Sequence, residues 1–126
     1  MTIVITNQPD ISKGILDIKE VNKMNDFLLN ILGLDDLFMC PHQDLDNCKC
    51  RKPKTGMLKI SIKKYNIDIS KSYLIGDRKT DILMANKIKC KSIFINRKYK
   101  EESPSTQSIT MPSFYKAAQY IAVSKG

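Results

Sequence analysis

The sequence predicts a single α/β domain, built as a Rossmann-like parallel β-sheet with helices on both faces. Short apolar runs alternate along the chain with segments whose apolar residues recur every three or four positions. Parallel strands need a helical crossover between them, so this alternation favours a parallel sheet. With 126 residues, of which 42% are hydrophobic and 27% charged, the chain has room for one packed core and no long linker.

The first half of the chain holds two predicted strands and two predicted helices. Residues 3–5 are a run of β-branched residues, typical of a buried strand. A helix is expected over 21–32, because apolar residues recur there with helical spacing and Gly33 follows as a stop signal. Residues 37–39 form the next predicted strand, and 58–65 the next helix.

The second half continues the same alternation. Residues 72–75 and 93–95 are predicted strands, separated by a helix over 82–88. Residues 104–112 form a mainly polar stretch that begins and ends with proline. A closing helix is predicted over 114–121, where four apolar residues share one face.

Polar and charged residues follow each of the four predicted strands. They occupy residues 6–8, 40–54, 76–81 and 96–98. In open parallel sheets ligands bind beyond the carboxyl ends of the strands. We therefore expect these segments to gather along one edge of the sheet and to form the functional site.

Composition narrows the class of partner. Lys and Arg total 21 against 13 Asp and Glu, a formal charge of +8 that favours anionic ligands. Aromatic residues make up 7% and no groove-reading motif is present, so nucleic-acid binding is not expected. No apolar run approaches the roughly 18 residues of a membrane span, and the first residues lack an export pattern. The sequence thus predicts a cytoplasmic protein without a membrane partner.

A cluster of thiols with the chain's one histidine indicates a metal site. Cys40, His42, Cys48 and Cys50 lie within an eleven-residue loop, 40–50, and supply the four ligands of a tetrahedral structural zinc. Their spacing differs from that of a nucleic-acid-binding finger. Disulfides and clustered free thiols are the alternatives. Cys90 stands apart and is expected to be a small buried hydrophobic residue.

A second set of residues suits phosphate chemistry. Thr6 follows the first strand, Arg51 and Lys52 follow the metal loop, and Asp77 and Asp81 follow a later strand. A hydroxyl and a lysine can hold phosphate oxygens, while a carboxylate can share Mg²⁺ with them. The alternative for Thr6 and for Asp77 is a capping role at the start of a helix.

These motifs resemble the haloacid dehalogenase superfamily of hydrolases. Within it they are most similar to the phosphatases of D-glycero-D-manno-heptose 1,7-bisphosphate and of histidinol phosphate. The Gly-Met pair after the zinc loop favours the heptose group. The segments that carry the resemblance are Thr6-Asn7-Gln8, Cys40-Pro41-His42, Cys48-Lys49-Cys50-Arg51-Lys52-Pro53, Gly56-Met57-Leu58 and Ser72 to Arg78 with Asp81.

The resemblance implies a phosphatase that acts on a small phosphorylated sugar through an aspartyl-phosphate. Thr6 would bind the transferring phosphoryl group and Lys52 would neutralise its charge. Asn7, Arg51 and Arg78 would contact the substrate. A basic rim suits a substrate with several negative charges.

The resemblance also implies two metal ions. Asp77 would ligate a catalytic Mg²⁺, with Asp81 supporting it from the second shell. The loop of three cysteines and one histidine would hold a structural Zn²⁺.

One motif of the family is missing. Its members begin with a strand ending in Asp-x-Asp-Gly-Thr, which supplies the nucleophile and the general acid. The chain's one Asp-x-Asp, residues 44–46, lies inside the zinc loop and is rejected as a substitute. In addition, Pro9 and Asp10 stand where the family has Ser-Gly.

The chain begins where the family's second strand begins, so the sheet is expected to lack a middle strand between those that lead to Thr6 and Asp77. The nucleophile strand would then come from a truncated or split N-terminal segment or from a second chain. We expect this chain alone to be inactive or nearly so. The alternative is a non-catalytic, zinc-stabilised binding or regulatory protein.

Overall fold

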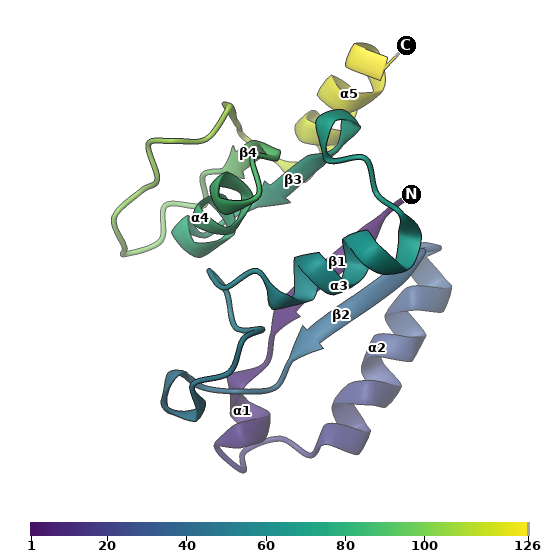
Figure 1. Cartoon of the computed structure of the whole chain (residues 1–126), viewed down its shortest axis with the longest axis vertical. Helices are drawn as coiled ribbons and strands as arrows, with labels where there is room; N and C mark the ends of the chain where they lie inside the picture. The colour runs from purple at the N-terminus through teal and green to yellow at the C-terminus, as the bar shows by residue number, and fades with distance from the viewer. Residues whose placement is uncertain (126) are drawn as a thin grey trace. The chain divides into compact units, whose positions relative to one another are not determined.

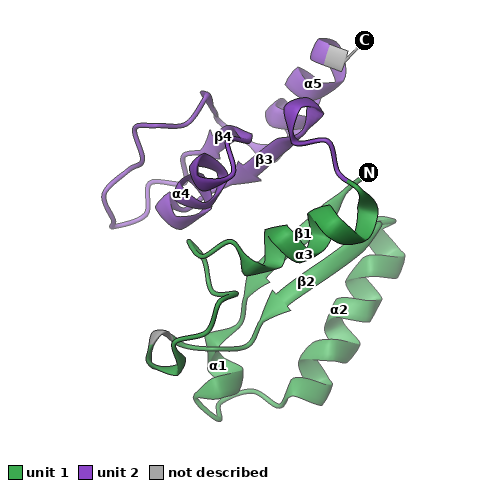
Figure 2. Cartoon of the chain, viewed as in Figure 1, with its two compact units in different colours: residues 1–66 green, residues 67–126 purple. Residues whose placement is uncertain are grey.

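The computed structural model describes residues 1–125, except for the side chains of Asp44 and Lys125. The chain divides into two compact units, Met1–Asn66 and Ile67–Gly126 (Figure 2). Each unit has its own parallel β-sheet (Figure 1). The parallel α/β class is therefore confirmed, with the described strands divided between two sheets. That the chain forms a single domain stays a prediction.

The first unit contains two strands, which pair in parallel. Register places Ile5 opposite Phe38 and Asn7 opposite Cys40, so the two strands end side by side. The polar residues that follow each strand thus start from one edge of this sheet. The elements are β1 (Ile3–Asn7), α1 (Pro9–Ser12), α2 (Ile18–Leu32), β2 (Asp36–Cys40), the 3-10 turn η1 (Asp44–Asp46) and α3 (Gly56–Tyr65).

Helix α2 shows how local sequence sets an element's ends. The side chain of Asp17 accepts a hydrogen bond of 2.8 Å from the backbone N–H of Lys19, which caps the first turn. Gly33 ends the helix with φ of 61°, a left-handed conformation that favours glycine. The stop signal predicted from the sequence is confirmed.

The second unit contains a three-stranded parallel sheet in the order β3-β4-β5. Its core joins Ile93 and Ile95 of the middle strand to Ala117 of the last helix, all three buried. Cys90 is also buried, as predicted, at 9% exposure. The elements are the 3-10 turn η2 (Ile69–Lys71), β3 (Tyr73–Gly76), α4 (Lys79–Lys87), β4 (Lys91–Ile95), β5 (Ile109–Met111) and α5 (Phe114–Lys125).

Strand β5 was not predicted from the sequence. It lies within the polar stretch 104–112. Three residues, Ile-Thr-Met, are too few to show a strand pattern. They form a strand because they pair with β4, with Ile109 opposite Ile93.

Each sheet has an end strand that carries predicted site residues. β1 is paired only with β2, and β3 only with β4, among the residues that the structure describes. Both strands therefore have one edge without a partner strand in residues 1–125. No helix within this part of the chain has the length and apolar character needed to cross a membrane.

Candidate functional site

The predicted metal ligands come together in the first unit. The ligand atoms of Cys40, His42, Cys48 and Cys50 all lie within 4.8 Å of one another. The Sγ of Cys40 lies 3.6 Å from that of Cys48 and 2.8 Å from that of Cys50. The Nδ1 of His42 lies 3.3 Å from the Cys50 sulfur and 3.6 Å from the Cys40 sulfur. All four cysteines of the chain are free thiols, so the disulfide alternative is not supported.

These distances fit one tetrahedral cation. Two sulfurs that each lie about 2.3 Å from a tetrahedral zinc are roughly 3.8 Å apart. Four of the six separations between ligand atoms fall near or below that value, and the other two lie within 4.8 Å. Three sulfurs and one imidazole nitrogen form a closed four-ligand set, typical of a structural rather than a catalytic metal site.

Burial, hydrogen bonds and the neighbouring thiols give the clustered cysteines different pKa values. Burial raises the pKa of Cys50, and the neighbouring Cys40 and Cys48 raise it further, to about 12. Burial also raises the pKa of Cys48, but hydrogen bonds, first that from the backbone N–H of Arg51, outweigh it and lower the pKa to about 6. Three thiolates therefore do not form together readily without a cation among them, which is the behaviour expected of metal ligands.

The metal loop is tied to its surroundings by hydrogen bonds outside the ligand cluster. The carboxylate of Asp46 accepts from the backbone N–H of Gln43, at 2.9 Å, and from the hydroxyl of Ser12. The backbone N–H of Gly56 donates to the carbonyl of Lys49 at 3.0 Å. A Cβ at position 56 would lie 2.4 Å from that carbonyl oxygen, so only glycine fits here without a shift. Asp44, named in the rejected Asp-x-Asp, has a side chain outside the described part.

Arg51 lies against the metal loop. Its backbone N–H donates to the Cys48 sulfur at 3.3 Å, and its Nη1 donates to the carbonyl of His42 at 3.3 Å. The guanidinium is thus held by the same loop that carries the metal ligands.

Lys52 lies at the end of β1. Its backbone N–H donates to the Oδ1 of Asn7 at 3.3 Å, and its Nζ donates to the carbonyl of Ile5 at 3.5 Å. Thr6 lies within β1, and the helix that follows begins after Gln8, so the capping alternative for Thr6 is wrong. The structure thus brings Thr6, Asn7 and Lys52 together beside the metal loop.

In the second unit, Asp77 follows β3. Its Oδ2 accepts a hydrogen bond of 3.0 Å from the hydroxyl of Tyr99 and forms an ion pair of 3.3 Å with the Nε of Arg97. Helix α4 is capped by Arg78, not by Asp77. The capping alternative for Asp77 is therefore wrong as well.

Asp81 has a structural position within the first turn of α4. Its Oδ2 accepts from the backbone N–H of Arg78 at 3.2 Å, and its residue exposure is 5%. It packs against Gly76, where an added Cβ would lie 2.3 Å from the Cβ of Asp81. Asp81 therefore shapes the turn that carries Asp77, and its predicted support of a Mg²⁺ ligand stays a prediction.

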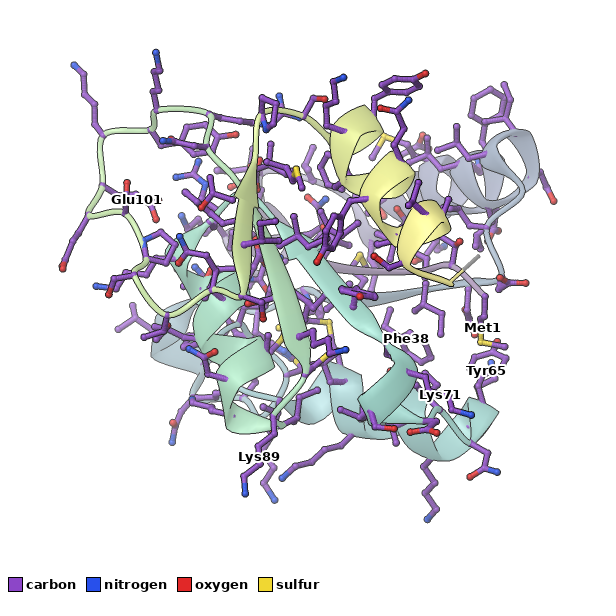
Figure 3. The ribbon with its side chains drawn as sticks, turned by 90° about the horizontal axis from the view of Figure 1, so that it is seen from above. Met1, Phe38, Tyr65, Lys71, Lys89 and Glu101 are labelled. Atoms are coloured by element: carbon purple, nitrogen blue, oxygen red, sulfur yellow. The ribbon has the colours of Figure 1, made fainter. Side chains whose placement is uncertain are left out.

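Arg78 is held by the loop between β4 and β5. Its guanidinium carbon lies 3.6 Å from the ring centroid of Tyr99, and its Nη1 lies 2.6 Å from the Oε1 of Glu101. Figure 3 shows Glu101 on this loop. Tyr99 and Glu101 lie just beyond residues 96–98, which were predicted to lie near the site, and were not themselves predicted, because loop contacts leave no periodic signal.

The predicted site residues thus form two groups, one in each unit. Thr6, Asn7, Arg51, Lys52 and the metal cluster belong to the first unit. Asp77, Arg78 and Asp81 belong to the second unit. That the two groups act on one substrate stays a prediction.

Comparison with known proteins identifies the family. A family model described as HAD-hydrolase-like, for the haloacid dehalogenase hydrolases, matches residues 49–114, which is more than half of the chain. The chain belongs to the HAD-like hydrolase family. The matched residues include Lys52, Asp77 and Asp81, so the recognition made from the sequence motifs is confirmed.

Curated relatives of this HAD-like hydrolase fall into two groups. The histidine biosynthesis bifunctional protein HisB of Buchnera aphidicola (subspecies Schizaphis graminum) is 37% identical over 113 residues, covering 86% of this chain and 31% of the relative. A D-glycero-alpha-D-manno-heptose-1,7-bisphosphate 7-phosphatase of Photorhabdus laumondii is 40% identical over 92 residues, covering 64% of this chain and 50% of the relative. The chain therefore spans about a third to a half of these two proteins.

A solved structure shares the fold of the HAD-like hydrolase. It is the D,D-heptose 1,7-bisphosphate phosphatase from B. bronchiseptica complexed with magnesium and phosphate. The TM-score is 0.85 at 23% identity, with 98% of this chain and 75% of that chain covered. The predicted HAD-like fold class is thus confirmed by a structure as well as by the family model.

Proposed function

We propose that the chain is part of a Mg²⁺-dependent sugar-phosphate phosphatase, with D-glycero-D-manno-heptose 1,7-bisphosphate as substrate and removal of the 7-phosphate as reaction. Relatives that carry this name and a structural neighbour that is a D,D-heptose 1,7-bisphosphate phosphatase support the proposal. Histidinol phosphate is the alternative substrate, because HisB relatives match at similar identity.

The observation that carries the proposal is the position of Lys52. Its backbone is hydrogen-bonded to Asn7, the last residue of β1, and its ammonium group to the carbonyl of Ile5, so this cation lies beside the carboxyl-terminal half of β1. Ligands of open parallel sheets bind at that end. A lysine fixed there can neutralise a phosphoryl oxygen at little cost in reorganisation.

In this proposal the metal loop, residues 40–50, positions the positively charged side chain of Arg51. A Zn²⁺ bound by Cys40, His42, Cys48 and Cys50 would lock the loop and contribute to folding. Arg51 contacts two of these residues, through the Cys48 sulfur and the His42 carbonyl. The zinc-bound loop would therefore fix the position of Arg51. We assign Arg51 to substrate binding together with Asn7 and Arg78.

Asp77 suits the role of Mg²⁺ ligand. Its side chain is 30% exposed, and within residues 1–125 its Oδ1 has no recorded hydrogen bond, while Oδ2 accepts from Tyr99 and forms an ion pair with Arg97. Mg²⁺ is commonly held by one or two carboxylates together with phosphate oxygens and water. When bound, the cation would neutralise charge on the phosphate. Thr6 would donate a hydrogen bond from its hydroxyl to the transferring phosphoryl group, and Asp81 would keep Asp77 in place.

The attacking carboxylate is proposed to come from a strand outside residues 1–126. Within residues 1–125, β1 and β3 each have one edge without a partner strand. A buried strand with about five apolar side chains contributes on the order of 8 to 15 kcal/mol. Its addition would therefore change both the stability and the activity of the protein.

The test compares this chain with a fusion in which a strand ending in Asp-x-Asp-Gly-Thr precedes it. Phosphate release from heptose 1,7-bisphosphate and from histidinol phosphate is measured with Mg²⁺. We expect negligible turnover by the chain alone, turnover by the fusion, and a higher kcat/KM for the heptose substrate. Equal turnover by both proteins would refute the proposed origin of the nucleophile.

A second candidate function is a non-catalytic, zinc-stabilised binding protein. It is favoured by one observation: residues 1–126 hold no Asp-x-Asp that directly follows a strand. Calorimetry with the sugar phosphate separates the two candidates. Binding by the fusion without turnover would support the binding protein, whereas turnover supports the phosphatase.

A further inference from the structure

Two side chains from one loop reach the same oxygen of Asp77. The hydroxyl of Tyr99 and the Nε of Arg97 both contact Oδ2, at 3.0 and 3.3 Å. No hydrogen bond to Oδ1 is recorded in the described part of the chain. The carboxylate is thus held through one oxygen and leaves the other for a ligand.

The loop that carries Tyr99 is itself anchored. The Tyr99 ring lies under the guanidinium of Arg78, 3.6 Å from its central carbon. Glu101 accepts from the Nη1 of Arg78 at 2.6 Å and from the backbone N–H of Lys79 at 3.2 Å. These contacts do not involve the Tyr99 hydroxyl, so the ring's place does not depend on its bond to Asp77.

We propose that Tyr99 is a positioning residue, which holds the Oδ2 of Asp77 so that Oδ1 is presented to a divalent cation. This inference rests on the proposed function, in which Asp77 is the Mg²⁺ ligand. Carboxylates that ligate metals are commonly hydrogen-bonded by such outer partners, and loss of a partner typically lowers metal affinity about 10- to 100-fold. A neutral hydroxyl suits this task because it orients the carboxylate without repelling the cation, whereas Arg97 adds a positive charge.

The test uses the Tyr99→Phe variant and Mn²⁺ as a paramagnetic probe in place of Mg²⁺. The variant keeps the ring that stacks on Arg78 and removes only the hydroxyl. Broadening of the backbone amide signals of Gly76 and Arg78 is followed as Mn²⁺ is added. We expect the Mn²⁺ concentration for half-broadening to rise about tenfold in the variant.

Tyr115→Phe is the matched control, because it removes a hydroxyl on α5 whose recorded partner is Gln119. The Mn²⁺ concentration for half-broadening in this control should match that of the unaltered chain. Amide spectra recorded without Mn²⁺ should show that each variant keeps the fold. An unchanged Mn²⁺ affinity in Tyr99→Phe would overturn the positioning role and leave the proposed function intact. If the Asp77→Asn variant shows the same Mn²⁺-dependent broadening as the unaltered chain, Asp77 is not a cation ligand. Both the inference and the proposed Mg²⁺ role then fail.

Discussion

The backbone N–H of Lys52 donates a hydrogen bond of 3.3 Å to the side-chain Oδ1 of Asn7, forty-five positions earlier in the chain. This bond connects the residue that follows the metal loop to the end of β1. A second bond, from the Lys52 ammonium to the carbonyl of Ile5, places the charge beside the carboxyl-terminal half of the same strand. Arg51 is held beside it by the metal loop, so metal binding and phosphate binding are expected to be coupled through adjacent residues.

Replacing Lys52 by alanine is expected to lower kcat/KM of the fusion protein about 100-fold, because a preorganised cation for the phosphoryl oxygens is lost. Phosphate release under Mg²⁺ measures the effect. Lys59→Ala, which removes an exposed lysine on α3, is the control and should lose less than about twofold. Similar losses in the two variants would mean that Lys52 contributes only general charge.

The chain is expected to bind about one zinc through its closed four-ligand cluster. Elemental analysis of purified protein measures the zinc content, and urea unfolding with and without a chelator measures its effect on stability. Cys50→Ser should lose most of the zinc and unfold at lower urea, whereas Cys90→Ala should keep its zinc because Cys90 lies outside the cluster. Full zinc content in Cys50→Ser would contradict the four-ligand site.

Gly76→Ala is expected to destabilise the protein by about 3 kcal/mol, since the new methyl group would meet the Cβ of Asp81 at 2.3 Å. Gly14→Ala is the comparison. Gly14 has φ of 75° with nothing within 4 Å of an added Cβ, so its substitution should cost only the left-handed conformation, about 1 kcal/mol. Urea unfolding curves decide the order, and a larger loss at Gly14 would contradict this account of the turn after β3.

Asp36 is expected to make the free energy of unfolding depend on pH. Hydrogen bonds from the hydroxyl of Tyr65 and from Lys64 lower its pKa from 3.8 to about 2. Because the folded-state pKa lies below the unfolded value, the stabilisation is complete above pH 3.8 and is lost as the pH falls toward 2. An NMR titration of the Asp36 carboxyl measures this pKa directly.

The matched pair for this effect is Asp36→Asn and Asp26→Asn. Asp26 is exposed on α2, and in the described residues it has no recorded hydrogen bond or ion pair. Urea unfolding at pH 5 and pH 2.5 should show a smaller loss of stability on acidification in Asp36→Asn than in the unaltered chain. In Asp26→Asn the loss should be unchanged, and an equal response of the two variants would refute the role of Asp36.

Local patterns were sufficient to predict most elements. The apolar spacing and Gly33 predicted α2, and the β-branched run predicted β1, because both depend on side chains close together in the sequence. The metal ligands could be predicted for the same reason, since all four lie within one loop.

Contacts between distant segments could not be predicted in this way. Strand β5 exists through its pairing with β4, and Tyr99 reaches Asp77 across twenty-two positions. No residue pattern along the chain encodes such a contact. The groups that stabilise it lie far apart in the sequence and come within bonding distance only when the chain folds. The sequence by itself thus determined the family motifs and the metal loop, while the tertiary structure decided which oxygen of Asp77 is held and which cations lie at the end of β1.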